Sequence, residues 1–128
     1  MQKQIVETMN APRPVGPYSQ AVMVGQFLFC SGQIAINPET NEVLQADVQT
    51  QARRVMDNLK AVVEASGLTL ENVVKTTIFL TDMGDFAAVN DVYQNYFVRK
   101  FPARSTIQVS GLPKGVKVEI EAVAVRHS

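Results

Sequence analysis

A helical apolar stripe lies near the middle of this 128-residue chain, between segments with the alternation of β-strands. From Asp47 to Ser66, apolar residues recur at three- and four-residue steps, which is the period of a helix with one buried face. They are Val48, Ala52, Val55, Met56, Leu59, Val62 and Val63. Asp47 can cap the start of this helix, and Gly67 can end it in a left-handed turn.

Strand patterns lie on both sides of this helix. Residues 18–24 and 27–31 read as two strands of a hairpin around a turn at Gly25-Gln26. After the helix, residues 73–80 are rich in Val, Thr, Ile and Phe, which favour strands.

A second helix is expected after Asp82 or Asp85, either of which can cap it, and Pro102 marks its end. Its inner face comprises Phe86, Val89, Tyr93, Tyr96 and Phe97. Residues 101–109 and 116–125 are expected to form the last two strands and to pair across a Gly/Pro turn. This order predicts an α+β fold, with crossover helices packed on one face of a mixed sheet.

The second face of such a sheet is too apolar to remain in water. The strand 73–80 carries Val74, Ile78 and Leu80 on one side and Val73 and Phe79 on the other. The strand 118–125 is also apolar on both faces near its end. Because two helices cover only one sheet face, we expect the other face to meet a further subunit of a homo-oligomer.

Composition narrows the possible partners and chemistry. Twelve basic residues balance twelve acidic ones, whereas nucleic-acid binders usually carry a basic surplus. Cys30 is the only cysteine and reads as a core residue, and His127 is the only histidine. A thiolate metal site and catalysis that relies on histidine are therefore not expected.

The length of 128 residues is typical of one domain, residues 1–128. No apolar run approaches the roughly 20 residues of a membrane helix. The first residues also lack the basic-then-apolar layout of a signal peptide. We therefore expect a cytoplasmic protein with no membrane partner.

Two charged residues flank the last Gly/Pro turn. Arg104 is either a surface or salt-bridged arginine, or a clamp whose planar fork of donors holds a carboxylate. Alternation places Glu119 and Glu121 on one strand face. Glu119 is either a solvated edge residue or a partly desolvated carboxylate that faces Arg104 and exchanges protons near neutral pH. The second alternative for each residue indicates chemistry on a small organic acid.

Three further residues, Gly32, Tyr18 and Asn90, also have two interpretations. Gly32, after Ser31, either ends a strand or lets the backbone approach a ligand. Tyr18 is either a core tyrosine with its hydroxyl at the rim or a site residue. Asn90 is either a solvent-facing residue of a helix or part of a site.

Six blocks of this chain, in this order, resemble the Rid family of reactive-intermediate deaminases, also called the YjgF family. They are Gly16-Pro17-Tyr18-Ser19-Gln20-Ala21, Ser31-Gly32-Gln33-Ile34, the strand 74–80, Asp85-Phe86-Ala87-Ala88-Val89-Asn90, Pro102-Ala103-Arg104-Ser105 and Val118-Glu119-Ile120-Glu121-Ala122. The blocks span nearly the whole chain, and the chain is most similar to the RidA-type subgroup.

The resemblance implies a chorismate-mutase-like two-layer fold, with a mixed six-stranded sheet and two helices on one face. It implies a homotrimer with clefts between subunits and no cofactor. The implied reaction is hydrolysis of 2-imino acids, such as 2-iminobutanoate and 2-iminopropanoate, to 2-oxo acids and ammonia. Pyridoxal-phosphate enzymes such as threonine dehydratase release the enamine precursors.

The resemblance also implies roles for individual residues. Arg104 would hold the substrate carboxylate, and Glu119 would position and activate the attacking water. Tyr18, Ser31, Gly32, Asn90 and Phe86 would line the cleft.

One position departs from the subgroup, because Thr106 stands where the subgroup commonly has cysteine. Thr106 would change the shape of the pocket while leaving the reaction class intact. A non-catalytic trimer that binds small acids, with a regulatory or chaperone-like role, remains the alternative function. RNA cleavage is the weakest option, because the charge is neutral and there is no histidine pair for acid–base catalysis.

Overall fold

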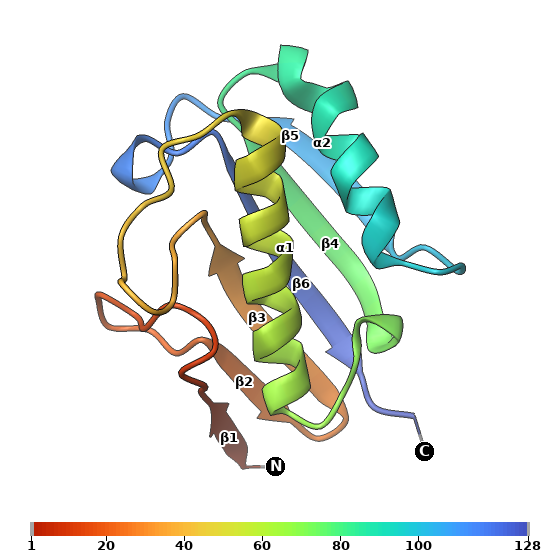
Figure 1. Cartoon of the computed structure of the whole chain (residues 1–128). Helices are drawn as coiled ribbons and strands as arrows, with labels where there is room; N and C mark the ends of the chain where they lie inside the picture. The colour runs from red at the N-terminus through yellow and green to blue at the C-terminus, as the bar shows by residue number, and fades with distance from the viewer. Residues whose placement is uncertain (1, 128) are drawn as a thin grey trace.

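The computed structural model describes residues 2–127, which form a six-stranded sheet with two helices packed on one face (Figure 1). The helices are α1 (Val48–Ala65) and α2 (Phe86–Tyr93). The strands are β1 (Lys3–Val6), β2 (Ala21–Val24), β3 (Phe27–Gln33), β4 (Val73–Leu80), β5 (Ala103–Gln108) and β6 (Val118–Val125). The expected α+β class, with a mixed sheet and helices on one side, is confirmed.

The strand order is β1-β2-β3-β6-β4-β5, so the last strand of the chain lies in the interior of the sheet. β4 and β5 run parallel because α2 carries the chain over the sheet between them, and the other neighbours are antiparallel. The expected pairing of the last two strands across their turn is wrong, because β4 lies between β5 and β6. The β2–β3 hairpin around Gly25 is confirmed.

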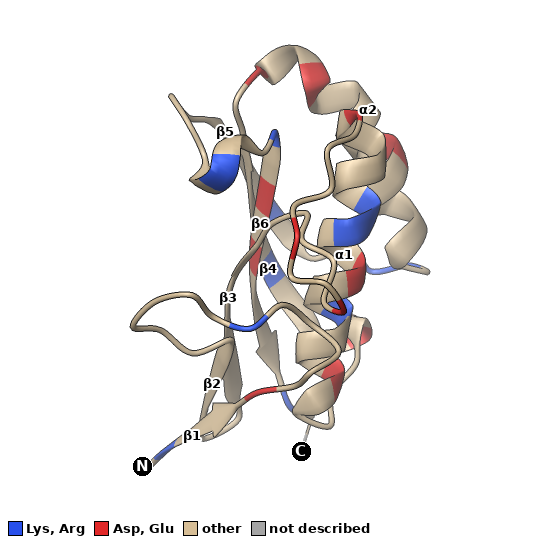
Figure 2. Ribbon diagram, turned by 60° about the vertical axis from the view of Figure 1, so that its left-hand side comes forward, with Lys and Arg blue, Asp and Glu red and all other residues tan. Residues whose placement is uncertain are grey.

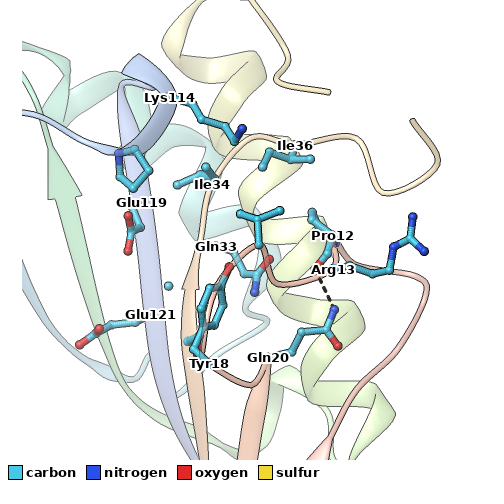
Figure 3. Close-up of a pocket in the computed structure, with 14 residues that line it drawn as sticks. Pro12, Arg13, Tyr18, Gln20, Gln33, Ile34, Ile36, Lys114, Glu119 and Glu121 are labelled. Atoms are coloured by element: carbon cyan, nitrogen blue, oxygen red, sulfur yellow. Dashed lines mark hydrogen bonds between the residues drawn. The ribbon is translucent and has the colours of Figure 1, made fainter. Parts of the chain in front are cut away.

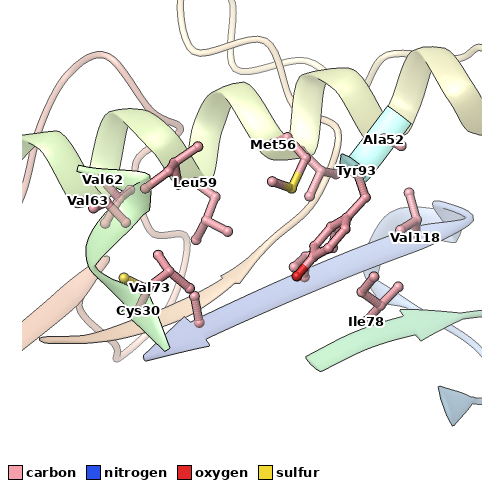
Figure 4. Packing of buried hydrophobic residues seen from close by; sticks show 14 of the residues in the cluster. Cys30, Ala52, Met56, Leu59, Val62, Val63, Val73, Ile78, Tyr93 and Val118 are labelled. Atoms are coloured by element: carbon pink, nitrogen blue, oxygen red, sulfur yellow. The ribbon is translucent and has the colours of Figure 1, made fainter. Parts of the chain in front are cut away.

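α1 forms as its apolar stripe predicts. The Asp47 carboxylate accepts a hydrogen bond from the Thr50 N–H at 2.8 Å and so caps the first turn. The helix ends at Ala65, and Gly67 then adopts φ +90°. Met56 and Leu59 are fully buried between α1 and the sheet (Figure 4). Each such side chain stabilises the fold by roughly 1.5–3 kcal/mol.

α2 is shorter than expected, and the chain continues from it as a single 3-10 turn, Gln94–Tyr96. The Asp82 carboxylate accepts from the Gly84 N–H at 2.8 Å in the 3-10 turn that precedes α2, whereas Asp85 makes no capping bond. Tyr93 is buried, and its hydroxyl lies 2.6 Å from that of Thr76 on β4. Phe86 is less deeply buried, at 37% exposed, and its ring lies against Arg104 of β5.

A bulge in β4 changes which residues face the helices. The register against β6 shifts between Val73 and Lys75. Val73 is consequently buried beside Ile78, and Val74 is exposed. The expected grouping of Val74 with Ile78 and Leu80 is therefore wrong, because a bulge adds one residue and reverses the alternation on one side of it.

The edge strand β1 has no counterpart among the expected strands. It is four residues long, pairs only with β2, and its side chains are mostly exposed. A short exposed strand lacks the apolar alternation by which strands are identified in a sequence. β2 also begins at Ala21 rather than at Tyr18, because residues 18–20 belong to the preceding loop.

Both α1 and α2 lie on one side of the sheet, so neither covers the opposite face, here called the open face (Figure 2). Phe27 and Phe29 are each 49% exposed, and their rings stack with centroids 6.2 Å apart. Ile107 on β5 is 45% exposed, and Phe79 on β4 is half-buried. The expectation of an apolar second face is confirmed. None of the helices among residues 2–127 is long and apolar enough to cross a membrane.

Candidate functional site

Glu119 lies on the open face of the sheet, in the middle of β6. It is opposite Phe79 of β4, whereas its neighbours Val118 and Ile120 are buried under the helices. On the other side, β3 carries a bulge between Cys30 and Gln33, where Ser31 and Gly32 pass the carboxylate. Bulges occur next to functional sites because they redirect the side chains around them.

Residue 32 must be glycine because the Glu119 side chain occupies the space that a Cβ atom would need there. A Cβ atom placed on Gly32 would lie 2.8 Å from Glu119 Cδ and closer still to Oε2. The backbone of Gly32 is outside the left-handed region, so the requirement for glycine comes from this contact alone. The carboxylate therefore rests directly on the backbone of β3.

The surroundings of Glu119 favour its protonated form. Partial burial raises the pKa of this carboxyl, and the negative charge of Glu121 on the same face raises it further. A carboxylate with a raised pKa is a stronger base than an ordinary surface glutamate. It is therefore suited to take a proton from water.

The loop before β2 forms a wall opposite Glu119, and buried Gln20 holds this loop in place. The Gln20 amide oxygen accepts from the Thr8 N–H at 2.7 Å. Its amide nitrogen donates to the carbonyl oxygens of Thr8, Ala11 and Pro12 at 3.1, 3.3 and 2.8 Å. Four hydrogen bonds from one side chain thus set the path of the loop that carries Tyr18.

These elements enclose a cavity of about 470 Å³, here called the Glu119 cavity (Figure 3). Tyr18, Ser31, Gly32 and Glu119 line it together. The Ser31 hydroxyl donates to the Ser19 carbonyl at 2.6 Å, which leaves its lone pairs free to accept a hydrogen bond. The cavity thus combines one base with an exposed phenol and a hydroxyl acceptor.

Arg104 lies at the opposite face of the sheet, against α2. Its Nη1 donates to Asn90 Oδ1 at 2.7 Å. Its guanidinium carbon lies 5.4 Å from the ring centroid of Phe86 and 5.3 Å from that of Tyr93, which is cation–π distance. These contacts orient the guanidinium, and a second cavity of about 440 Å³ is lined by Arg104, Asn90 and Tyr93 among others.

The expectation that Glu119 faces Arg104 is wrong within one chain. Arg104 is in register with Thr76 of β4, and Glu119 is in register with Phe79. Thr76 is buried under the helices, whereas Phe79 points to the open face, so the two charged side chains leave the sheet on opposite sides. The structure brings the expected residues together as two groups rather than one.

Thr106 belongs with the arginine group. It is in register with Ile78, two positions after Arg104, and so lies on the same sheet face as Arg104. Its hydroxyl is buried and has no hydrogen-bond partner among the described residues. An unpaired buried hydroxyl is costly, and a ligand that bonded to it would remove that cost.

Two contributors were missed at the sequence level. Tyr93 was assigned to the core alone, although its ring also contacts the Arg104 guanidinium. The spacing of Phe86, Asn90 and Tyr93 on one helix face could have revealed it. Lys114, which lines the Glu119 cavity, was treated only as part of a turn.

The remaining candidate groups have structural roles. Cys30 is buried in the core, as expected, and burial raises the pKa of its thiol to about 12, which makes the thiol unreactive. Within residues 2–127, no cluster of three histidine, cysteine or acidic side chains is arranged to hold a metal ion.

Comparison with known proteins identifies the family to which the chain belongs. Residues 8–126 match the family model described as endoribonuclease L-PSP. The 2-iminobutanoate/2-iminopropanoate deaminase of Escherichia coli strain K12 is 52% identical over 95% of this chain and 97% of its own length.

Two solved structures have nearly the same fold over nearly the same length. Escherichia coli TdcF with bound serine has a TM-score of 0.93 and 49% identity, covering 97% of this chain and 99% of its own. The Yersinia pestis protein YyfA, of the conserved Rid protein family, has a TM-score of 0.95 and 48% identity over 97% and 99%. The chain described here therefore belongs to the Rid family, which the endoribonuclease L-PSP model represents.

Proposed function

We propose that this protein hydrolyses 2-imino acids such as 2-iminobutanoate and 2-iminopropanoate to 2-oxo acids and ammonia. The observation that carries the proposal is the Glu119 carboxylate, which is half-buried against Gly32, has a raised pKa and lines a cavity. The oriented guanidinium of Arg104 is suited to hold the carboxylate of such a substrate. The name of the Escherichia coli relative agrees with this chemistry.

The reaction needs one base and one clamp. Glu119 accepts a proton from water as the water oxygen bonds to the imine carbon, and the C=N π electrons move to nitrogen. With the substrate in its protonated, iminium form, Glu119 then returns this proton to the amine nitrogen. The C–N bond breaks as the hydroxyl oxygen forms the C=O bond of the 2-oxo acid, and the hydroxyl proton passes to the departing ammonia. An iminium carbon is already electrophilic, so little further activation is needed. Orientation of the acid and delivery of the water therefore supply most of the decrease in activation free energy.

Because Arg104 and Glu119 lie on opposite faces of one sheet, a complete site requires two copies of the chain. We propose a homotrimer in which the Arg104 group of one subunit meets the Glu119 group of its neighbour. The apolar open face, with its stacked Phe27 and Phe29, supports burial of this face between subunits.

The other site residues have supporting roles in this proposal. Asn90 and Phe86 fix the orientation of the Arg104 guanidinium. The unpaired hydroxyl of Thr106 would form a hydrogen bond with the ligand. Tyr18 lines the side of the cavity opposite Glu119, and Ser31 lies on β3 next to it, so that both would orient the substrate and its water. The substrates would come from enamines released in the cytoplasm by pyridoxal-phosphate enzymes, which is where we place the protein.

The test is an assay coupled to threonine dehydratase, in which the protein should speed release of 2-oxobutanoate from threonine. Arg104→Ala should abolish this acceleration, whereas Arg126→Ala, an exposed arginine after β6, should retain it. Glu119→Gln should lower kcat by about 100-fold or more, the usual contribution of a general base, with less effect on KM. Full activity of Arg104→Ala would refute the clamp, and equal turnover by Glu119→Gln would refute the base.

A non-catalytic acid-binding protein is the second candidate, because a serine-bound structure exists for the relative TdcF. That function requires the same Arg104 clamp without turnover. Calorimetric binding of 2-oxobutanoate, together with no acceleration in the dehydratase assay, would favour this candidate over the deaminase.

A further inference from the structure

The Glu119 cavity extends well beyond the residues that the proposed reaction needs. Past Ser31, its wall is formed by the apolar side chains of Ile34 and Ile36 from the segment after β3. Pro12 and Val15 of the loop before β2 add to this apolar surface. A volume of about 470 Å³ is in the range of pockets for ligands much larger than a four-carbon imino acid.

A lysine stands at the far end of this apolar wall. Lys114 lies in the turn between β5 and β6 and lines the same cavity as Glu119. Figure 3 shows its side chain extending toward Ile36, so that its ammonium lies away from the Glu119 carboxylate. The cavity thus has a carboxylate base at one end, an apolar wall in the middle and a cation at the other end.

The backbone at Lys114 is unfavourable for a lysine. Its φ of 57° and ψ of 20° lie in the left-handed region, where a side chain costs roughly 1 kcal/mol relative to glycine. Gly115, the next residue, also has a positive φ of 70°. Residues held in such conformations concentrate at functional sites, and here the conformation aims a cation along the cavity wall.

The charges around the cavity leave this cation available to a ligand. The Lys114 side chain extends toward Ile36 and away from the Glu119 carboxylate, so its ammonium is not directed at that carboxylate (Figure 3). The Glu121 carboxylate is directed away from Tyr18 and from the interior of the cavity, and the Arg13 guanidinium also points outward (Figure 3). Of the two cations that line the cavity, Arg13 and Lys114, Lys114 is therefore the one that extends along the apolar wall (Figure 3).

We propose that Lys114 determines substrate preference by binding a side-chain carboxylate, so that the favoured substrates are 2-imino dicarboxylic acids. This inference rests on the proposed deaminase function. With the imine carbon at Glu119, the methylene groups of the substrate lie along Ile34 and Ile36. The distal carboxylate then reaches Lys114 in a charge-assisted hydrogen bond.

The test compares two imines formed in place by flavin-dependent amino-acid oxidases, one from glutamate and one from 2-aminobutanoate. The quantity measured is the ratio of kcat/KM for the dicarboxylic imine to that for the neutral imine. Lys114→Gln should lower this ratio by about fivefold or more, the size expected for loss of a partly exposed charge pair. Lys114→Arg should retain most of it, because the charge remains.

Two further variants separate charge from backbone strain and from a general field effect. Lys114→Gly removes the charge and relieves the strained backbone, so its ratio should fall as far as that of Lys114→Gln. Lys117→Gln removes the same charge three residues away, outside the cavity lining, and should leave the ratio unchanged. Added salt should lower the ratio of the unsubstituted protein more than that of Lys114→Gln.

The outcomes distinguish this inference from the proposed function. An equal ratio in Lys114→Gln and the unsubstituted protein, with both imines hydrolysed, would overturn the role of Lys114 and leave the deaminase function standing. No acceleration with either imine would overturn the deaminase function itself.

Discussion

Glu119 is a carboxylate that folding makes harder to ionise, and this gives stability a defined dependence on pH. Its folded-state pKa lies above the ordinary value of 4.5, so the folded protein favours the protonated form. Below that ordinary pKa, the carboxyl is protonated in both states and imposes no cost. As pH rises through the folded-state pKa, ionisation of Glu119 favours the unfolded chain, in which its pKa is lower. The free energy of unfolding therefore decreases.

Glu119→Gln should therefore raise the Tm at pH 7, and the gain should shrink as pH falls through the folded-state pKa and vanish below the ordinary value of 4.5. Thermal unfolding across this range checks the prediction. Glu39→Gln, which changes an exposed loop carboxylate, is the control and should show no such trend. A Glu119→Gln protein less stable than the parent at pH 7 would contradict the prediction.

Gly32 and Glu119 should be energetically coupled, because a Cβ on Gly32 would meet the carboxylate at 2.8 Å from Cδ. Gly32→Ala should destabilise the protein by about 1–3 kcal/mol through overpacking. In a protein that also carries Glu119→Ser, Gly32→Ala should lower the free energy of unfolding by at least about 1 kcal/mol less. Urea unfolding of the parent, the two single variants and the double variant measures this difference as a double-mutant cycle. Gly111→Ala meets no atom within 4 Å and serves as the control. Additive effects of the Gly32 and Glu119 changes would rule out the coupling.

At the scale of elements, the loop before β2 depends on one buried side chain. Gln20→Leu removes four hydrogen bonds, so the Thr8 N–H and the nearby carbonyl groups lose their partners. We expect the free energy of unfolding to fall by about 2–4 kcal/mol. We expect exchange of the Thr8 amide to rise at least about tenfold in hydrogen-exchange measurements, since the loop opens locally. Gln26→Leu, in the exposed β2–β3 turn, should leave that exchange unchanged. Protection of Thr8 in both variants would show that Gln20 does not hold the loop.

The elements differ in how far the sequence revealed them. α1 was predictable because its apolar stripe is long and its cap is local. β1 was not, because a short exposed strand has no apolar alternation. The position of β6 between β3 and β4 depends on pairing between distant segments, which periodicity does not encode. The bulge that exposes Val74 is likewise a property of two strands together.

The site was predictable as a set of residues and not as an arrangement. Blocks shared with a family identified Arg104 and Glu119 and the residues around them. Their separation onto two faces follows from the register of β5 and β6 against β4, which only the folded sheet supplies. Lys114 could not be predicted as a cavity residue, because its position there depends on the backbone path of the turn between β5 and β6.

At the scale of the whole molecule, the open face should be where copies of the chain meet. Phe29→Glu places a charge on this face and should convert the proposed trimer to monomers, because an unpaired charge is costly to bury. Light scattering after size-exclusion chromatography measures the mass, and turnover should fall with it if the site lies between subunits. Val98→Glu changes a residue that is 80% exposed outside the sheet and should leave the mass unchanged. A monomeric parent protein of full activity would refute the shared site.

The interior position of β6 has a consequence for how the protein is made. Until residues 118–125 leave the ribosome, β1-β2-β3 and β4-β5 are two partial sheets with no shared hydrogen bonds, because β6 is the strand that joins them. The core beneath α1 therefore cannot close during most of synthesis. The newly made chain should stay protease-sensitive and open to chaperones until residues 118–125 are available to pair, and then fold in one late step.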